Sequence, residues 1–209
     1  ANRELTVIAS GGDGDGFAIG MGHTIHAFKR NVDMTYIVMD NQIYGLTKGQ
    51  TSPTSAPGFK TKSTPKGSIE KSVSPVELAL TAGATFVAQS FSNDLKGLTQ
   101  LIEQATAHKG FAFINVFSPC VTFNKVNTYD WFKQNLTKLS DIEGYDPSNL
   151  DLAKQTVHAH DGLVMGLIYQ DETRPDYQSQ IDGYQESGLA YADLELNEET
   201  FGKLAAEFM

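Results

Sequence analysis

Two short segments of the sequence combine glycines with oxygen-bearing side chains, and each directly follows an apolar run. Residues 11–16 read Gly-Gly-Asp-Gly-Asp-Gly, and residues 40–45 read Asp-Asn-Gln-Ile-Tyr-Gly. Glycines let a ligand approach the backbone closely, and the free amides at the start of a helix attract anions. The composition of the two segments therefore predicts a site for an anionic ligand such as a phosphate.

The aspartates of the first segment conflict with a bare phosphate, because Asp13 and Asp15 would repel it. The conflict disappears if a divalent cation lies between carboxylate and phosphate. Mg²⁺ prefers oxygen ligands in near-octahedral geometry, usually one or two protein carboxylates together with phosphates and water. Asp13 can give a carboxylate oxygen, Asn41 an amide oxygen and Ile43 its backbone carbonyl. We therefore expect a magnesium site if both segments lie at one edge of a sheet.

The sequence around these segments predicts a strand–helix–strand unit. Residues 5–10 and 35–39 are short apolar runs rich in β-branched side chains, and residues 17–29 carry apolar side chains near helical spacing. The unit spans roughly 35 residues, the size of a right-handed crossover between parallel strands. Residues 48–72 have no apolar period and are predicted as a long loop, which in a compact domain is often functional.

Strands and helices continue to alternate along the chain. Ser74 is expected to cap a helix that ends at Gly83, and Asn93 or Asp94 a helix that ends near His108. The other expected elements are strands at 85–91, 111–117 and 163–169 and helices at 129–136, 150–158 and from 198 onward. This alternation predicts an α/β fold with a mainly parallel sheet and helices on both faces. Ligands of such sheets bind at the carboxyl ends of the strands.

The composition argues against several classes of partner. The chain has 209 residues and a net charge of −9, and its basic residues are scattered, which disfavours nucleic acid. No apolar stretch reaches the roughly 18 residues that cross a membrane, and the first residues lack the features of a secretory signal. We therefore expect a cytoplasmic protein without membrane association. The single cysteine, Cys120, excludes a disulfide within the chain.

Both glycine-containing segments resemble motifs of a known family. Gly12-Asp13-Gly14, followed after 26 residues by Asn41, is similar to the motif that binds diphosphate and magnesium in thiamine diphosphate enzymes. Residues 43–54, Ile-Tyr-Gly-Leu-Thr-Lys-Gly-Gln-Thr-Ser-Pro-Thr, resemble one branch of that class. That branch is the β subunit of the 2-oxoacid:ferredoxin oxidoreductases.

The resemblance covers residues 5 to about 124 and implies a domain organisation. Residues 1–125 are expected to form the α/β core that binds thiamine diphosphate and Mg²⁺. Residues 126–209 are expected to be a C-terminal extension that packs on this core and on a partner subunit.

The resemblance also assigns roles to individual residues. It implies that Mg²⁺ is bound by Asp13, Asn41 and the Ile43 carbonyl. It implies that thiamine diphosphate is lined by Gly12, Gly14, Asp15, Gly45 and Leu46. On the catalytic side, Leu46 is expected to face the reacting thiazolium carbon and the substrate. Lys48 is a candidate for binding the substrate carboxylate, with a solvated loop cation as the equal alternative.

Cys120 lies in residues 118–124, Ser-Pro-Cys-Val-Thr-Phe-Asn, which resemble a stretch that supplies one ligand of a [4Fe–4S] cluster in this family. The other three ligands of such a cluster come from an N-terminal segment that carries a Cys-x-x-Cys pair. No such pair is present in this sequence, and we therefore expect an N-terminal segment to be missing from it. Without the resemblance, Cys120 would be interpreted as a small buried hydrophobic residue.

The implied function is the oxidative decarboxylation of a 2-oxoacid with coenzyme A to acyl-CoA and CO₂, with reduction of ferredoxin. The carboxylic acid that activates the cofactor in this class lies on the partner. The chain is therefore expected to be active only with an α subunit, or with α plus γ, and the active site is expected at the interface between them.

Three other functions fit parts of the sequence. A non-oxidative thiamine diphosphate decarboxylase or synthase would share the magnesium site without needing Cys120. A dinucleotide-binding domain would use the glycines, but residues 12–17 end in Phe17 where that motif has glycine. A calcium-binding module would need an oxygen ligand where Phe17 stands and a glutamate where Thr24 stands.

Overall fold

The computed structural model describes residues 5–181 and 197–208 of the chain. Its internal contacts divide the chain into two units, a larger one of Thr6–Ile181 and a smaller one to which the described residues 5 and 197–208 belong. The smaller unit contains helix α6 (Glu198–Ala206), which begins at the predicted residue. No helix within the described residues is both long and apolar enough to cross a membrane.

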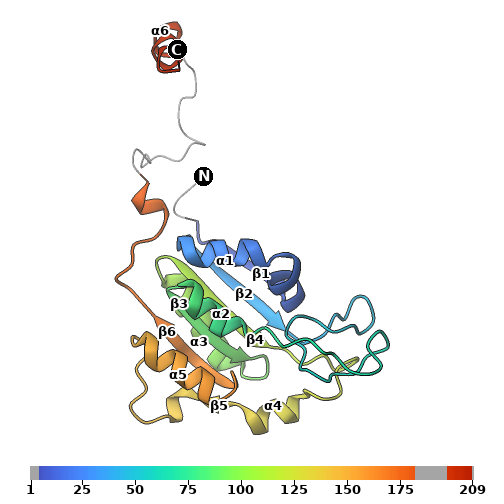
Figure 1. Ribbon diagram of the computed structural model, residues 1–209. Coiled ribbons are helices and arrows are strands. Elements are labelled where there is room, and N and C mark those ends of the chain that lie inside the picture. The colour runs from blue at the N-terminus through green and yellow to red at the C-terminus, as the bar shows by residue number, and fades with distance from the viewer. Residues whose placement is uncertain (1–4, 182–196, 209) are drawn as a thin grey trace. The chain divides into compact units, whose positions relative to one another are not determined.

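The larger unit is built on a six-stranded sheet with the order β1-β2-β4-β3-β6-β5 (Figure 1). All neighbouring strands are parallel except β6, which runs antiparallel to β3. The strands are β1 (Ile8–Gly12), β2 (Met34–Asp40), β3 (Phe86–Phe91), β4 (Phe111–Phe117), β5 (Thr137–Lys138) and β6 (Val164–Gln170). The predicted mainly parallel α/β sheet is thereby confirmed.

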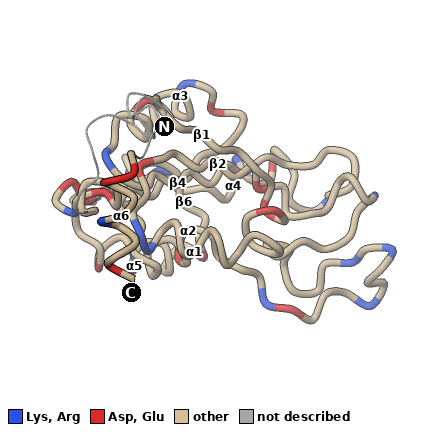
Figure 2. Tube along the Cα trace, turned by 90° about the horizontal axis from the view of Figure 1, so that it is seen from above, with Lys and Arg blue, Asp and Glu red and all other residues tan. Residues whose placement is uncertain are grey.

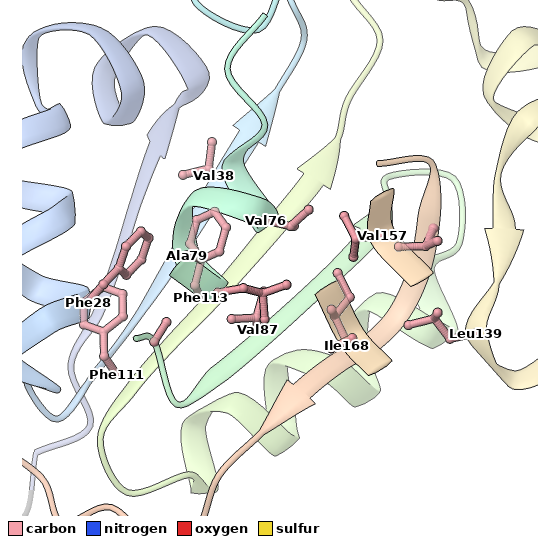
Figure 3. Packing of buried hydrophobic residues seen from close by; sticks show 14 of the residues in the cluster. Phe28, Val38, Val76, Ala79, Val87, Phe111, Phe113, Leu139, Val157 and Ile168 are labelled. Carbon is pink, nitrogen blue, oxygen red and sulfur yellow. The ribbon is translucent and has the colours of Figure 1, made fainter. Parts of the chain in front are cut away.

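Helices cover both faces of this sheet, as predicted. Helices α1 (Met21–Arg30), α2 (Pro75–Ala82) and α5 (Leu150–Ala159) share one core cluster with β-strand residues. Helix α3 (Leu95–Ala107) packs with the opposite face in a second cluster. In the first cluster the ring of Phe28, from α1, meets that of Phe111, from β4, edge to face (Figure 3). The short helix α4 (Tyr129–Asn135) packs against the carboxyl ends of β3 and β4 through Phe132.

The first crossover differs from the prediction in two respects. Strand β1 lies at Ile8–Gly12, whereas the apolar run predicted a strand at 5–10. The predicted helix at 17–29 consists of a π-helical turn, η1 (Asp15–Ile19), followed by α1. Gly20 joins them, and its amide donates to the Asp15 carbonyl oxygen at 2.9 Å. A Cβ atom at Gly20 would lie 2.2 Å from that same oxygen, so a side chain there is incompatible with the wide turn. Such turns are often found at functional sites.

The residues after 125 take part in the sheet. Strands β5 and β6 lie at one edge of it, and Gln89 of β3 pairs in register with Gly166 of β6. The division at residue 125 into a core and an extension stays a prediction.

The amino ends of the strands are held together by Asn31, a buried residue in the left-handed conformation (φ 55°) after α1. Its Oδ1 accepts hydrogen bonds from Thr85 Oγ1 (2.6 Å) and from the Phe111 amide (2.8 Å). Its Nδ2 donates to the Pro175 carbonyl oxygen (3.1 Å). Asn31 therefore joins α1, β3, β4 and the segment after β6.

Arg174 caps two helices at this same end of the sheet. Its guanidinium donates to the carbonyl oxygen of Gly83, which follows α2 (2.6 Å), and to that of Lys29 in the last turn of α1. A cation at helix C-termini is favoured because the free carbonyl groups there carry partial negative charge.

Candidate functional site

The two glycine-containing segments lie at the same edge of the sheet. Strands β1 and β2 are parallel neighbours, and Gly12 pairs in register with Met39. Asp13 and Asp40 follow directly, and Asn41 is one residue further on. The long loop after β2 extends from the end of the sheet at which the β2 arrow points (Figure 1). The arrangement that the magnesium prediction required is therefore present.

The two segments also touch one another. A Cβ atom built on Gly14 would lie only 2.1 Å from the ring of Tyr44. Any side chain at position 14 would therefore push the Tyr44 ring, and with it the second segment, away from the first. Gly14 is needed here for close approach between loops.

The second segment forms a closed loop with strained backbone. The Tyr44 amide donates to the Gln50 carbonyl oxygen (2.9 Å), and the Gly49 amide donates to the Tyr44 carbonyl oxygen (2.8 Å). Gln42 and Lys48 have positive φ angles of 59° and 73°. Non-glycine residues in this region cost about 1–3 kcal/mol each and are concentrated at functional sites.

The side chains at the tip of this loop extend away from the protein. Leu46 is 98% exposed, and Lys48 is exposed as well. Gly45 has open space around the position of a Cβ atom. The three residues predicted to face cofactor and substrate therefore lie together, at the surface of the sheet's carboxyl edge.

The three predicted magnesium ligands provide oxygen atoms of suitable chemistry. Asp13 is 2% exposed, and its Oδ2 accepts hydrogen bonds from Ser52 Oγ and Thr54 Oγ1 (2.6 Å). Within the described residues, no hydrogen bond is donated to Asp13 Oδ1 or to the carbonyl oxygen of Ile43. Asn41 Oδ1 accepts from the Ile43 amide (3.0 Å) and keeps one lone pair. A carboxylate, an amide and a carbonyl fit the preference of Mg²⁺ for oxygen.

This donor set contains only one carboxylate. In the part of the chain that the structure describes, no three His, Cys, Asp or Glu side chains form a group that could hold a metal ion. The magnesium site therefore stays a prediction that rests on the mixed oxygen set.

The loop at 48–72, predicted from the sequence, returns to cover Asp13. Besides Ser52 and Thr54, the loop brings in Ser55, whose Oγ donates to the carbonyl oxygen of Gln42 (2.7 Å) and accepts from the Ser52 amide (2.9 Å). All three hydroxyl residues are buried. Ser52 and Thr54 lie in the 43–54 motif, but no role was predicted from the sequence for these side chains or for that of Ser55.

Asp40 is a second buried carboxyl group beside Asp13. Its Oδ1 lies 2.8 Å from Thr54 Oγ1, and its Oδ2 accepts from Asn115 Nδ2 (3.3 Å). Burial, followed by the negative charge of Asp13, raises the pKa of Asp40 to about 7, against the opposing hydrogen bonds of Thr54, Asn115 and the Gln42 backbone.

Asp15 is arranged differently from Asp13. Its side chain is exposed, and Oδ2 accepts a hydrogen bond from the Gly12 amide (2.8 Å). Burial, followed by the charge of Asp15, raises the pKa of the nearby Tyr36 hydroxyl. Asp15 thus stabilises the first loop from outside, and its predicted contact with the cofactor stays a prediction.

Cys120 lies at the same edge, in a turn after β4. The Ser118 amide donates to the Asp40 carbonyl oxygen (2.8 Å), and a Cβ atom at Gly49 would lie 3.3 Å from the Phe123 ring. The Cys120 thiol is free and partly exposed.

The local environment of Cys120 favours the thiolate. Partial burial raises the pKa of the thiol, but hydrogen bonds from the backbone amides of Phe123, Thr122 and Asn124 and the charge of Lys125 outweigh it, so the pKa lies below its usual value. The thiolate is the form of cysteine that binds metals.

Several large apolar side chains at this edge have little cover. More than half of the residue surface is exposed at Ile19, Leu46, Val121 and Val126. Exposed apolar groups that are gathered around a functional site are typical of surfaces that bind a partner. Charged residues of both signs are scattered over the rest of the trace, without a basic stripe (Figure 2).

Comparison with known proteins defines the class first. Residues 1–116 match the family model for the thiamine pyrophosphate enzyme, C-terminal TPP binding domain. Residues 120–186 match the family model for the C terminal part of the pyruvate ferredoxin oxidoreductase beta subunit. The fold and the site thus define a thiamine pyrophosphate enzyme domain.

Individual relatives narrow this class. The 2-oxoacid:ferredoxin oxidoreductase subunit beta of Sulfolobus sp is 40% identical over 98% of this chain and 70% of its own length. That of Saccharolobus solfataricus is 41% identical over 87% of this chain and 63% of its own. The chain belongs to the family of 2-oxoacid:ferredoxin oxidoreductase β subunits, as the sequence motifs predicted.

One solved structure is similar to this chain as well. It is 2-oxoglutarate:ferredoxin oxidoreductase from Magnetococcus marinus with 2-oxoglutarate, coenzyme A and succinyl-CoA bound. The TM-score is 0.79 at 44% sequence identity, covering 83% of this chain and 59% of that one. This chain therefore spans about three fifths to two thirds of the length of several of its relatives.

Proposed function

We propose that this chain is the cofactor-binding β subunit of an enzyme that oxidatively decarboxylates a 2-oxoacid with coenzyme A, giving acyl-CoA and CO₂ and reducing ferredoxin. The observation that carries the proposal is the convergence of Asp13 and Asn41 at one sheet edge, with their loops in contact. The family of the chain supplies the reaction class.

Asp13 Oδ1, Asn41 Oδ1 and the Ile43 carbonyl oxygen would hold Mg²⁺, which neutralises the diphosphate beside the buried aspartate. Gly12 and Gly14 would let the diphosphate approach the backbone. When bound, thiamine diphosphate supplies a thiazolium carbon that adds to the keto group and an electron sink for the pair left behind by CO₂.

The exposed loop tip would complete the substrate side. Gly45 and Leu46 would contact the cofactor, with Leu46 buried once the partner covers it. Lys48, exposed on the same turn, would attract the substrate carboxylate. Asp15 would contribute to the cofactor pocket from the first loop.

The partner is an α subunit, because the relatives are named as β subunits. We propose that it binds over the exposed Ile19, Leu46, Val121 and Val126. With it would come the site for coenzyme A and the acid that activates the cofactor, and ferredoxin would accept the electrons.

Cys120 would bind one iron of a [4Fe–4S] cluster through its stabilised thiolate. It is the only cysteine of the sequence, so three further ligands would have to come from outside these 209 residues. Visible absorbance of the assembled enzyme tests this directly, since loss of absorbance in Cys120→Ser is expected if the cysteine is a ligand.

The main test is calorimetric titration of the α–β complex with thiamine diphosphate, with and without Mg²⁺. We expect tight binding only with Mg²⁺, and a loss of roughly 100-fold or more in Asp13→Asn. Asp151→Asn, an exposed aspartate on α5, is the matched control and should bind normally. Equal binding without the metal, or by Asp13→Asn, would contradict the proposal.

A further inference from the structure

A row of buried polar residues crosses the sheet at its carboxyl edge, one from each of four neighbouring strands. Asp13 follows β1, Asp40 ends β2, Asn115 lies in β4 and Gln89 lies in β3. Each is at most 2% exposed. Residues 85–91 and 111–117 were predicted only as strands, without a role for Gln89 or Asn115.

The row replaces one layer of the apolar core. Two residues before Asp40, Asn115 and Gln89 in their strands, Val38, Phe113 and Val87 all belong to the core cluster beneath α1, α2 and α5 (Figure 3). Successive side chains on one face of a strand are two residues apart, so the polar row lies on that same face. Buried polar groups cost free energy unless they are paired.

The members of the row are paired with one another. Asn115 Nδ2 donates to Gln89 Oε1 (3.0 Å) and to Asp40 Oδ2 (3.3 Å). Gln89 Nε2 donates to the carbonyl oxygens of Gly162 (2.6 Å) and Val164 (2.7 Å), at the start of β6. A continuous chain of hydrogen bonds therefore joins Asp40 to the far side of the sheet.

Thr54 closes the last gap, between Asp40 and Asp13. Its Oγ1 lies 2.6 Å from Asp13 Oδ2 and 2.8 Å from Asp40 Oδ1. Among the described residues, it is the one side chain that hydrogen-bonds to both carboxyl groups. It comes from the long loop, so the row depends on the loop as well as on the sheet.

The hydroxyl group of Thr54 has a single hydrogen for these two acceptors. It can point to one carboxyl group at a time. A cation held by Asp13 Oδ1 would leave Oδ2 as an acceptor for the Thr54 hydrogen. The hydroxyl group is thus placed where it can hold the carboxylate in position for a cation on its other oxygen.

We propose that Thr54 is a positioning residue for the cation. It fixes Asp13 for Mg²⁺ and ties the metal-binding loop, through Asp40, Asn115 and Gln89, to the start of β6. The inference rests on the proposed function, since it takes Asp13 as a ligand. It adds that metal affinity depends on residues that do not touch the metal.

The experiment compares Mg²⁺ affinities of the α–β complex at saturating thiamine diphosphate by calorimetry. Residues that orient metal ligands typically change affinity by roughly 10- to 100-fold, and we expect that loss in Thr54→Val, which keeps the shape of the side chain. Thr54→Ser restores the hydroxyl group and should bind nearly normally. Thr156→Val makes the same substitution at a buried threonine of α5 that takes no part in these hydrogen bonds, so it is the matched control.

Gln89→Met is a second variant that tests the far end of the row. It lies across the sheet from the loop, and we expect a several-fold loss of Mg²⁺ affinity in the same direction. Thermal melting without metal checks that each variant is folded.

The outcomes separate the two proposals. Normal Mg²⁺ affinity in Thr54→Val, or an equal loss in Thr156→Val, would overturn the role of Thr54 and leave the proposed function intact. Absence of any Mg²⁺ requirement in the unmodified complex would overturn both.

Discussion

The two ends of the sheet use polar residues in opposite ways. At the amino end, Asn31 uses both polar atoms of its side chain on the chain itself, and Arg174 satisfies the ends of two helices. At the carboxyl end, Oδ1 of Asp13 and the carbonyl oxygen of Ile43 accept no hydrogen bond from the described residues.

Buried polar atoms without a hydrogen-bond partner also differ between the two ends of the sheet. Within the described chain, three buried side-chain atoms lack a hydrogen-bond partner: Ser90 Oγ, Asn115 Oδ1 and Asn124 Nδ2. All three lie toward the carboxyl end, in the last half of β3, in β4 and in the Cys120 turn. Such exceptions are rare in folded proteins and call for an explanation. Among the described residues, the amino end thus satisfies its own buried polar side chains, whereas the unpaired atoms all lie toward the carboxyl end.

The largest expected effect is the loss of stability when the hydrogen bonds of Asn31, at the amino end of the sheet, are removed. Asn31→Ala removes the acceptor for Thr85 and for the Phe111 amide and places alanine in a left-handed conformation. Each buried group left without a partner costs about 1–3 kcal/mol, so we expect the free energy of unfolding to fall by about 3 kcal/mol. Urea unfolding measures it.

Asn135→Ala, at the exposed end of α4, is the control and should be close to neutral. Cofactor affinity should survive in the Asn31 variant wherever it remains folded. A loss of Mg²⁺ affinity in Asn31→Ala without a loss of stability would show that the amino end of the sheet influences the site at the carboxyl end.

At the carboxyl end, a substitution is expected to raise the free energy of unfolding instead of lowering it. Asp13→Asn keeps acceptors for Ser52 and Thr54 but removes one of two buried like charges, so the free energy of unfolding without metal should rise by about 1 kcal/mol. Urea unfolding of the metal-free protein checks this. A drop in stability would mean that Asp13 holds the fold together instead of being held ready for a cation.

Much of this arrangement could be predicted from the sequence. The apolar runs and the glycine segments placed the strands and their loops, and the short crossover made β1 and β2 neighbours. From there, parallel strands bring Asp13 and Asn41 to one edge. The antiparallel pairing of β6 and the wide turn at Gly20 could not be foreseen, because both depend on contacts between distant parts of the backbone.

The polar row was missed for a different reason. Gln89 and Asn115 are single amides inside apolar strands, and the surrounding residues dominate the pattern. The usable signal was the amide itself, because a buried amide must find partners. Thr54 ends the 43–54 motif, but the loop has no periodicity that indicates which way a side chain faces, and the partners of Thr54 are 14 and 41 residues away.

The smallest expected effect is a pH dependence that belongs to the amino end. His108 Nε2 lies 2.8 Å from Thr85 Oγ1, and its ring packs on Phe86. Burial lowers the pKa of His108, against the opposing charges of Glu172, Asp33 and Asp171. The unfolded chain then binds a proton more readily than the folded one, so stability is complete above the ordinary histidine pKa of about 6.5 and is lost as pH falls toward the folded-state pKa.

The free energy of unfolding, measured with urea at pH 7.5 and at pH 5.0, tests this pH dependence. His108→Gln keeps an N–H donor for Thr85 and removes the titration, so the variant should lose less stability than the parent between these pH values. His26→Gln, an exposed histidine on α1, should leave the pH dependence unchanged. If the His108 variant loses as much stability as the parent between these pH values, the proton is taken up by another group and not by His108.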